Sequence, residues 1–383
     1  MSKRVVIAGG GTGGHLFPGI ALAKALKGHD MEIEITFVGT KQGIESKVLP
    51  REGFALKTIM SSGLLGKRSI HRWAAWCKLP VGITQSLWFL VRKRPNLVVG
   101  VGGYASGPLV LSAWVLRIPI LLHEQNSVPG MTNRWLGKLA DKVAVSFKES
   151  ARFFPEGKVE VTGNLVREEF CIPREQVAPR DPSEKFTVLV LGGSQGAHSI
   201  NMAMVDALDH LANEKESIHI VHQTGEKDFD EVRFSYNQKG FRSADVRPFI
   251  DEVAEQYRKA SLVICRSGAT TLAEISACGK VSVLIPFPHA AHNHQEKNAR
   301  ILEAADAADL ILDKDVTGYL LARSIHNAME NPDQLEEREE NSYRLGKREA
   351  TEKVKQICLQ LMEETRSSRL QGQSETKHLM SCF

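Results

Sequence analysis

The sequence lacks any C-x-x-C pair and any regular spacing of cysteines, although six cysteines occur in 383 residues. This scatter argues against a zinc ribbon and against a disulfide scaffold, and it predicts reduced thiols in a cytosolic protein. The cysteines are Cys77, Cys171, Cys265, Cys278, Cys358 and Cys382.

Long apolar runs are also missing. The most apolar segment outside the predicted strands, residues 81–91, is interrupted by Thr84, Gln85 and Ser86, and it is far shorter than the roughly 20 residues that span a bilayer. Near the N-terminus the apolar run covers residues 5–8 only, which is too short for the core of a signal peptide. We therefore expect a protein that is neither exported nor embedded in a membrane.

The charge balance is close to neutral, with a formal net charge of +4, 25% charged residues and 42% hydrophobic residues. Such a small and dispersed excess gives no reason to expect nucleic acid as a partner. The composition is that of an ordinary globular protein, and the length exceeds that of most single domains. Two domains are therefore expected.

Short β-branched runs alternate with amphipathic segments, and this order occurs twice. The first set has predicted strands at 4–10, 34–40, 97–103 and 119–125, with helices at about 18–27 and 44–52. The second has predicted strands at 185–196, 217–225, 244–250, 260–268 and 281–287. Alternating strands and helices predict parallel sheets covered by helices on both faces. The fold class is therefore α/β, with two Rossmann-like domains.

Proline and charge mark the boundary between the halves, because residues 168–185 carry three prolines and no apolar period. We expect an N-terminal domain at 1–167 and a C-terminal domain at 168–340. A charged helix at about 345–366 is expected to dock back on the N-terminal domain. Residues 367–383 are polar and predict a frayed, disordered tail.

Three glycine-rich turns follow predicted strands: GGGTGGH at 9–15, GVGGYASG at 100–107 and GGSQG at 192–196. The first fits G-x-G-x-x-G, which is typical of dinucleotide sites, but these sites need an acidic residue at the end of the second strand. That strand ends at Thr40 without an acid. A single glycine turn is often only a tight connection, whereas three at the carboxyl ends of parallel strands predict a ligand site.

Here the chain resembles the MurG family of glycosyltransferases over residues 4–360. The resemblance lies in GGGTGGHLFPGIALA, SSGLLGK, GVGGYASGP, HEQNSVPGMTNRWL, VTGNLVRE, LGGSQGAHSIN, FIDEV and CRSGATTLAEISACGK, in this order. It implies the GT-B fold, in which two Rossmann-like domains face an interdomain cleft. The C-terminal domain would bind UDP-N-acetylglucosamine (UDP-GlcNAc), and the N-terminal domain would bind a lipid acceptor.

The resemblance implies roles for residues of the donor site. The backbone of Ile250 would pair with uracil, Glu274 would accept hydrogen bonds from ribose, and Ser194 with the helix amides near Ala269 would contact the diphosphate. A solvated helix position is the alternative for Glu274. The full set of expected donor-binding residues is Thr12, Gly13, Gly14, Asn126, Arg167, Ser194, Ile250, Ala269, Thr270, Thr271, Leu272, Ala273, Glu274 and Gln295.

Transfer requires a group that accepts the proton of the attacking hydroxyl. His15 opens a helix beside the first glycine turn, and histidine titrates near neutral pH, so His15 is the preferred base. Two alternatives stay open: His15 could bind the acceptor diphosphate, and Glu124 could be the base or could orient His15. The residues expected to bind the acceptor are Gly11, Gly102, Gly103, Tyr104 and His123.

Two patterns suggest a metal without requiring one. Residues 313–315 read Asp-Lys-Asp, like the D-x-D of metal-dependent glycosyltransferases, but they precede Thr317 and a helical pattern, which favours capping. His289, His292 and His294 share one loop and could bind a metal adventitiously. The resemblance implies no catalytic metal and no cofactor.

Aromatic and basic residues are interleaved between 64 and 94, a combination suited to an anionic membrane surface. The alternative places the tryptophans in the core and the charges on a solvated rim. The residues are Leu64, Leu65, Lys67, Arg68, Arg72, Trp73, Trp76, Lys78, Trp88, Phe89, Arg92, Lys93 and Arg94. The resemblance implies peripheral binding to the cytoplasmic face of the bacterial cell membrane.

The resemblance implies inverting transfer of GlcNAc from UDP-GlcNAc to the C4 hydroxyl of N-acetylmuramic acid in lipid I, undecaprenyl-pyrophosphoryl-MurNAc-pentapeptide. The product would be lipid II, a precursor of peptidoglycan. Further partners would be other proteins of cell-wall synthesis and division. The alternatives are a Rossmann oxidoreductase, a GT-B enzyme with another acceptor, a nucleotide-sugar epimerase, and a sensor without catalysis.

Overall fold

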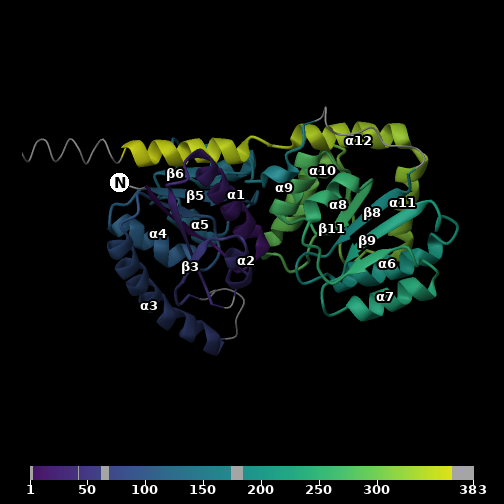
Figure 1. Ribbon diagram of the computed structural model, residues 1–383, viewed down its shortest axis with the longest axis horizontal. Helices are drawn as coiled ribbons and strands as arrows, with labels where there is room; N and C mark the ends of the chain where they lie inside the picture. Colours follow the sequence, from purple (N-terminus) through teal and green to yellow (C-terminus); the bar gives the residue numbers. More distant parts are fainter. Residues whose placement is uncertain (1–2, 42, 62–68, 174–183, 365–383) are drawn as a thin grey trace, which may run out of the picture. The chain divides into compact units, whose positions relative to one another are not determined.

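The computed structural model describes residues 3–41, 43–61, 69–173 and 184–364, with the backbone alone for 69–78. It divides into two compact units, each with its own parallel sheet (Figure 1). The N-terminal unit comprises Met1–Arg167 and Glu349–Phe383, and the C-terminal unit comprises Glu168–Arg348. The predicted α/β class, with two parallel sheets, is confirmed.

The N-terminal unit has a seven-stranded sheet in the order β3-β2-β1-β4-β5-β6-β7, and all neighbouring strands are parallel. Its elements are β1 (Arg4–Ala8), α1 (Gly13–His29), β2 (Glu34–Gly39), α2 (Glu45–Arg51), β3 (Ala55–Thr58), α3 (Ser69–Lys93), β4 (Leu97–Gly100), α4 (Ser106–Val115), β5 (Ile120–Glu124), α5 (Met131–Leu136), β6 (Lys142–Val145), η1 (Lys148–Phe153) and β7 (Val159–Val161). The order runs outward from β1 and β4, so the turns after these two strands lie where the direction of winding changes.

Both faces of the sheet are buried at its central strands β1, β4 and β5, which explains why β1 and β4 are apolar almost throughout rather than alternating. Along β1, Val5 and Ile7 pack with α1, whereas Val6 and Ala8 pack in a second cluster that includes Leu109 of α4. The alternation follows from the strand geometry, in which successive side chains point to opposite faces.

A helix over residues 350–364 completes the core of the N-terminal unit, although it comes last in the described chain. Val354, Ile357 and Cys358 are buried in the cluster that contains α1. Thr351 Oγ1 also donates to Val166 O at 2.8 Å and accepts from Val166 N at 3.1 Å.

The C-terminal unit has a six-stranded parallel sheet in the order β10-β9-β8-β11-β12-β13. Its elements are η2 (Glu168–Phe170), β8 (Phe186–Leu191), α6 (His198–His210), β9 (Ile218–Gln223), α7 (Phe229–Gln238), β10 (Asp245–Arg247), α8 (Val253–Lys259), β11 (Leu262–Cys265), α9 (Ala269–Cys278), β12 (Ser282–Leu284), η4 (Ala291–Asn293), α10 (His294–Ala304), β13 (Ala308–Leu310), α11 (Gly318–Glu330) and α12 (Pro332–Leu345). The turns after β8 and β11 lie at the corresponding change of winding.

The first helix begins earlier than the sequence predicts. The prediction places the start near Pro18, but α1 begins at Gly13 and contains Pro18. The first turn is closed by Thr12 O, which accepts from His15 N at 3.3 Å and from Leu16 N at 3.2 Å. His15 therefore lies within the first helical turn.

Candidate functional site

Two glycine turns of the N-terminal unit pack directly on each other at the carboxyl ends of β1 and β4. Gly10 and Gly11 have φ of 148° and 85°, and Gly102 and Gly103 have φ of 95° and 82°. A Cβ on Gly103 would collide with the carbonyl oxygen of Gly10. Glycine is required here both for the positive φ and for the close approach of the two backbones.

His15 stands against the second of these turns, and its environment selects one tautomer. Its Nδ1 lies 3.2 Å from Val101 O, and a Cβ on Gly102 would lie 2.6 Å from the same nitrogen. A carbonyl oxygen can only accept, so Nδ1 carries the proton. In the neutral ring, Nε2 then holds the lone pair that a general base needs.

Beside His15, the chain buries a second histidine and a glutamine. The Nε2 of Gln125 donates to Val101 O at 2.7 Å and lies 3.1 Å from His123 Nδ1. Burial, with a smaller contribution from the charge of His15, lowers the pKa of His123 from 6.5 to about 4, although a bond to the backbone of Gly163 raises it. His123 is therefore neutral near pH 7. Gln125 lies in the HEQNSVPGMTNRWL segment, directly after β5, but the sequence predicts no role for it because that role depends on contacts with Val101 and His123.

Glu124 is buried and holds the segment that follows β5. Its Oε1 accepts from Asn126 N at 2.9 Å and from Asn126 Nδ2 at 3.3 Å, and its Oε2 accepts from Asn133 Nδ2 at 2.8 Å. Burial raises the pKa of Glu124, and the bonds to Asn126 and Asn133 oppose that rise. Val101 O, rather than Glu124, faces the Nδ1 of His15. Asn133 was not identified from the sequence.

The remaining residues predicted for this unit differ in their surroundings. Gly11 donates its amide to Glu45, whereas Thr12 is the N-cap of α1, and Gly13 and Gly14 follow in its first turn. Tyr104 is exposed, and its carbonyl accepts from Ser61. The guanidinium of Arg167 lies 4.8 Å from the ring centre of Phe17.

In the C-terminal unit, Gln223 joins two predicted parts of the donor site. Its Nε2 donates to Gly193 O at 3.0 Å, and its Oε1 accepts from Ile250 N at 2.8 Å. Ser194 is exposed on the same turn as Gly193. Sequence reasoning found both segments but not Gln223, because a glutamine at a strand end is not a distinctive signal.

The N-terminus of α9 provides backbone amides at the end of β11. Gly268 is the N-cap, with an extended backbone and no side-chain cap. Ala269, Thr270 and Thr271 form the first turn, where the backbone N–H groups of a helix point out of its N-terminus. Leu272 differs, because its N–H donates to Gly268 O at 3.0 Å and its side chain is buried.

The side chains of Ala273 and Glu274 come next on α9. Ala273 is half-buried, and Glu274 is only 8% exposed. The interpretation of Glu274 as a solvated helix position is therefore wrong. A carboxylate on a buried helix face makes specific polar contacts rather than contributing to solubility.

Gln295 ties the start of α10 to its neighbours. Its Oε1 accepts from Phe287 N at 2.9 Å, and its carbonyl accepts from Ser267 Oγ at 3.0 Å. This arrangement fixes the amide plane, and the Nε2 of Gln295 has no protein partner among the described residues. Gln295 can therefore donate to a ligand.

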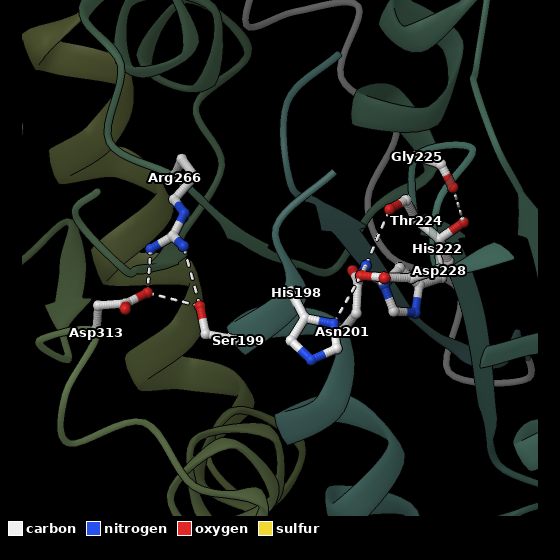
Figure 2. Close-up of polar contacts among 9 residues, drawn as sticks. All are labelled: His198, Ser199, Asn201, His222, Thr224, Gly225, Asp228, Arg266 and Asp313. Carbon is white, nitrogen blue, oxygen red and sulfur yellow. Dashed lines mark hydrogen bonds and ion pairs between the residues drawn. The ribbon is translucent and has the colours of Figure 1, made fainter. Parts of the chain in front are cut away.

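The Asp-Lys-Asp pattern does not cap a helix through Asp313. Asp313 Oδ1 pairs with Arg266 and accepts from Ser199 Oγ at 2.6 Å, and Arg266 Nη2 donates to Ser199 Oγ at 2.9 Å (Figure 2). The cap of α11 is Thr317, whose Oγ1 accepts from Leu320 N. The capping prediction for Asp313 is therefore wrong, because its role depends on Arg266, 47 positions earlier.

The histidine loop forms no metal cage in the described part of the chain. No group of three or more histidine, cysteine, aspartate or glutamate side chains there is arranged to hold a metal ion. His294 Nδ1 lies 2.7 Å from Ala291 O, and burial lowers the pKa of His294. The ring of His289 packs edge-on against Phe287.

A second polar network, drawn in Figure 2, includes Thr224, whose carbonyl packs against Gly196 of the third glycine turn. His222 is buried between Tyr236, whose hydroxyl lies 2.9 Å from Nδ1, and Asn201, whose Oδ1 lies 3.1 Å from Nε2. Asn201 Nδ2 donates to Thr224 O and to Asp228 Oδ2. Because Asn201 uses its amide as donor elsewhere, its oxygen must accept from His222, whose Nε2 therefore carries a proton.

This buried histidine predicts a pH-dependent stability. Burial lowers the pKa of His222 from 6.5 to about 3. Between these two pH values the imidazole binds a proton in the unfolded chain but not in the native state. The contribution of His222 to the free energy of unfolding is therefore fully present above the pKa of the unfolded state. It decreases as the pH falls toward the pKa of the folded state, by about 2 kcal/mol at about pH 5. Urea unfolding of the wild type at about pH 7 and about pH 5 should give a difference that includes this contribution and that of His123, and the difference for His222→Gln should be smaller by about 2 kcal/mol. His219→Gln, on the same strand, should retain it; an undiminished difference in His222→Gln would refute the assignment.

Comparison with known proteins first defines the class. The glycosyltransferase family 28 N-terminal domain matches residues 5–145, and the family 28 C-terminal domain matches residues 187–357. The chain is therefore a two-domain glycosyltransferase of this class, and each match falls on one of the two parallel sheets.

Individual relatives narrow the class. The UDP-N-acetylglucosamine--N-acetylmuramyl-(pentapeptide) pyrophosphoryl-undecaprenol N-acetylglucosamine transferase of Myxococcus xanthus is 46% identical over 364 residues, or 94% of each chain. The protein of the same name from Geobacter sulfurreducens is 45% identical over 92% of this chain and 96% of its own. The chain belongs to the MurG family.

Solved structures agree with this assignment. The crystal structure of Acinetobacter baumannii MurG has a TM-score of 0.71 at 28% identity, covering 93% of this chain and 98% of that chain. A UDP-GlcNAc 2-epimerase from Neisseria meningitidis has a TM-score of 0.65 at 14% identity, covering 94% of this chain and 100% of its own, and shares the fold alone. The predicted GT-B fold is confirmed. In the described residues, no helix combines the length and apolar character needed to cross a bilayer.

Proposed function

We propose that this chain transfers GlcNAc from UDP-GlcNAc to the C4 hydroxyl of the MurNAc unit of lipid I, with inversion, and so forms lipid II for peptidoglycan synthesis. Relatives of that name are 46% and 45% identical over nearly the whole chain. The observation that carries the proposal is His15, whose Nδ1 is held by Val101 O so that Nε2 can accept a proton.

In this mechanism His15 Nε2 removes the proton as the sugar hydroxyl attacks the anomeric carbon. His123 stays uncharged beside it, because burial lowers its pKa to about 4, so it does not compete for the proton near neutral pH. Glu124 fixes the segment that carries Asn126 and Asn133. This role of Glu124 replaces the alternative in which it is the base.

The leaving UDP gains negative charge as the bond to the sugar breaks. The amides of Ala269, Thr270 and Thr271 at the N-terminus of α9 stabilise the diphosphate, together with Ser194. Glu274 accepts from the ribose hydroxyls, and the Ile250 carbonyl accepts from uracil, since its N–H is used by Gln223. Gln295 Nε2 donates to the sugar.

A nicotinamide or flavin enzyme is disfavoured by the surroundings of Thr40. The carboxylate nearest to the end of β2 is Glu45, which is completely buried and accepts from Thr40 and Gly11. It is therefore closed to the ribose hydroxyls that an acidic residue binds in such enzymes.

Incubation with radiolabelled UDP-GlcNAc and a lipid I analogue tests the proposal. A labelled lipid product that migrates as lipid II supports it, and titration with UDP and NAD separately measures nucleotide preference. Release of free labelled sugar, or conversion to another UDP-sugar without lipid labelling, would instead indicate a hydrolase or an epimerase.

We also propose that the chain binds the cytoplasmic face of the cell membrane through α3. Trp88 is 59% exposed, and Val81 and Val91 on the same helix are exposed. The guanidinium of Arg92 lies 5.4 Å from the ring centre of Trp88. The core alternative fails for Trp88, but Phe89 packs against the core. Residues 64–68 and the side chains of Arg72, Trp73, Trp76 and Lys78 lie outside the described part of the structure.

Replacement of Trp88 by alanine should weaken binding to anionic vesicles by about tenfold, because one exposed aromatic side chain no longer enters the interface. Flotation of the folded protein with vesicles rich in phosphatidylglycerol measures this. Phe234→Ala provides a control, since Phe234 is 62% exposed but lies on α7 of the C-terminal unit. Equal flotation of wild type and Trp88→Ala would argue against this surface.

A further inference from the structure

Glu45 is a completely buried carboxylate at the first position of α2. Its Oε2 accepts from Gly11 N at 2.8 Å, and its Oε1 accepts from Thr40 N at 2.8 Å and from Thr40 Oγ1 at 3.0 Å. These partners are neutral groups from two different loops. A buried carboxylate is costly unless its oxygens are satisfied, so this side chain binds the two loops firmly.

The sequence leaves room for Glu45 by placing glycine around it. A Cβ on Gly10 would lie 2.5 Å from Glu45 Cδ, and a Cβ on Gly39 would lie 2.7 Å from Glu45 Cγ. A Cβ on Gly43 would collide with the carboxylate. Gly10, Gly39 and Gly43 thus form a socket for the side chain of Glu45. This side chain fills the space beneath the first glycine turn.

The first glycine turn, which Glu45 holds, packs against the second glycine turn that contacts His15. Gly10 packs against Gly103, and the neighbouring Gly102 lies against the ring of His15. His15 also bonds to Val101 O, which immediately precedes these glycines. A displacement of the first turn therefore moves the second turn, and with it the carbonyl that sets the tautomer of His15.

We propose that Glu45 is a positioning residue for the transfer reaction, which acts by fixing the first glycine turn and thereby the bond between His15 Nδ1 and Val101 O. The inference rests on the proposed function in one respect, namely that His15 is the base. Glu45 touches neither substrate in this scheme. Its Gly11 bond also means that this amide faces the protein interior, so Gly11 contributes conformation to the acceptor site rather than a hydrogen bond.

Glu45→Gln tests the inference, because it keeps the shape but points an NH2 group at a backbone N–H. We expect kcat/KM for a lipid I analogue to fall about 100-fold, as displacement of a catalytic group commonly does, while the affinity for UDP stays unchanged. Activity is normalised to the fraction of protein that binds UDP, so that loss of folded protein is not counted. Glu52→Gln is the matched control: Glu52 directly follows α2 and pairs with Lys24 outside the socket.

A second measurement does not depend on activity. Nitrogen-15 NMR of the histidine rings distinguishes the two neutral tautomers, and the His15 signals are identified by their absence in His15→Gln. Wild type and Glu52→Gln should show His15 protonated on Nδ1, and Glu45→Gln should show a mixture of tautomers. If Glu45→Gln fails to fold, Thr40→Val, which removes one donor to Oε1, should give smaller changes in the same direction.

The outcomes separate the two hypotheses. Unchanged His15 signals and unchanged kcat/KM in both Glu45→Gln and Thr40→Val would overturn the positioning role of Glu45. A wild-type protein that labels no lipid would instead overturn the proposed function, while a tautomer change in Glu45→Gln would still support the coupling of Glu45 to His15.

Discussion

Replacement of His15 by glutamine is expected to lower kcat for transfer to lipid I about 1000-fold, within the range that a general base contributes. The glutamine amide can still donate to Val101 O, which now accepts from His15 Nδ1 at 3.2 Å, so the second glycine turn should keep its conformation. What is lost is the basic lone pair of Nε2. Single-turnover transfer of labelled GlcNAc measures the loss, and titration with UDP should give the wild-type affinity.

The control for this variant lies on the same helix. His29 is exposed at the end of α1, and His29→Gln should retain full activity. Near wild-type kcat with a raised KM for the lipid in His15→Gln would contradict the assignment of the base. That result would favour the alternative in which His15 binds the acceptor diphosphate.

Glu274→Gln is expected to weaken binding of UDP and UDP-GlcNAc about 100-fold, since a hydrogen bond to a charged group contributes about 1.5–3 kcal/mol. Glu274 is buried on α9, and the amide that replaces its carboxylate offers one acceptor fewer to the ribose diol. Calorimetric titration measures the loss. The variant should also discriminate less than wild type between UDP and 2′,3′-dideoxy-UDP, because the hydroxyl contacts are the ones removed.

A matched acidic control is available in the same unit. Glu303 on α10 is partly exposed and lies 3.4 Å from Arg300, and Glu303→Gln should bind UDP as wild type does. Equal weakening of UDP and dideoxy-UDP by Glu274→Gln would place the effect in folding of α9 rather than in ribose recognition.

Features with a local cause were predictable from the sequence. The glycine turns follow strands, and their positive φ values and close contacts demand glycine, so their pattern could be recognised without a structure. His15 was found because it adjoins such a turn. The two parallel sheets followed from the alternation of apolar strands and amphipathic helices.

Features that depend on distant partners were missed or misassigned. Glu45 bonds to the backbone of Gly11, and Gln223 bonds to the backbone of Gly193, each at least 30 positions away in the sequence. The residues that flank Glu45 and Gln223 in the sequence do not distinguish them from a surface glutamate or glutamine. Asp313 preceded a helix and so resembled a cap, but its partner is Arg266. Tertiary contacts decide such roles, and spacing in the sequence does not reveal them.

The helix over residues 350–364 makes the N-terminal unit discontinuous, whereas the C-terminal unit is one uninterrupted stretch, Glu168–Arg348. During synthesis the ribosome therefore delivers every residue of the C-terminal unit before the last helix of the N-terminal core exists. Val354, Ile357 and Cys358 fill that core. The N-terminal unit therefore starts to emerge from the ribosome before the C-terminal unit but is completed after it. Until residues 350–364 have left the exit tunnel, the apolar side chains of α1 that share a cluster with them lack these partners, which gives a chaperone time to bind the nascent chain.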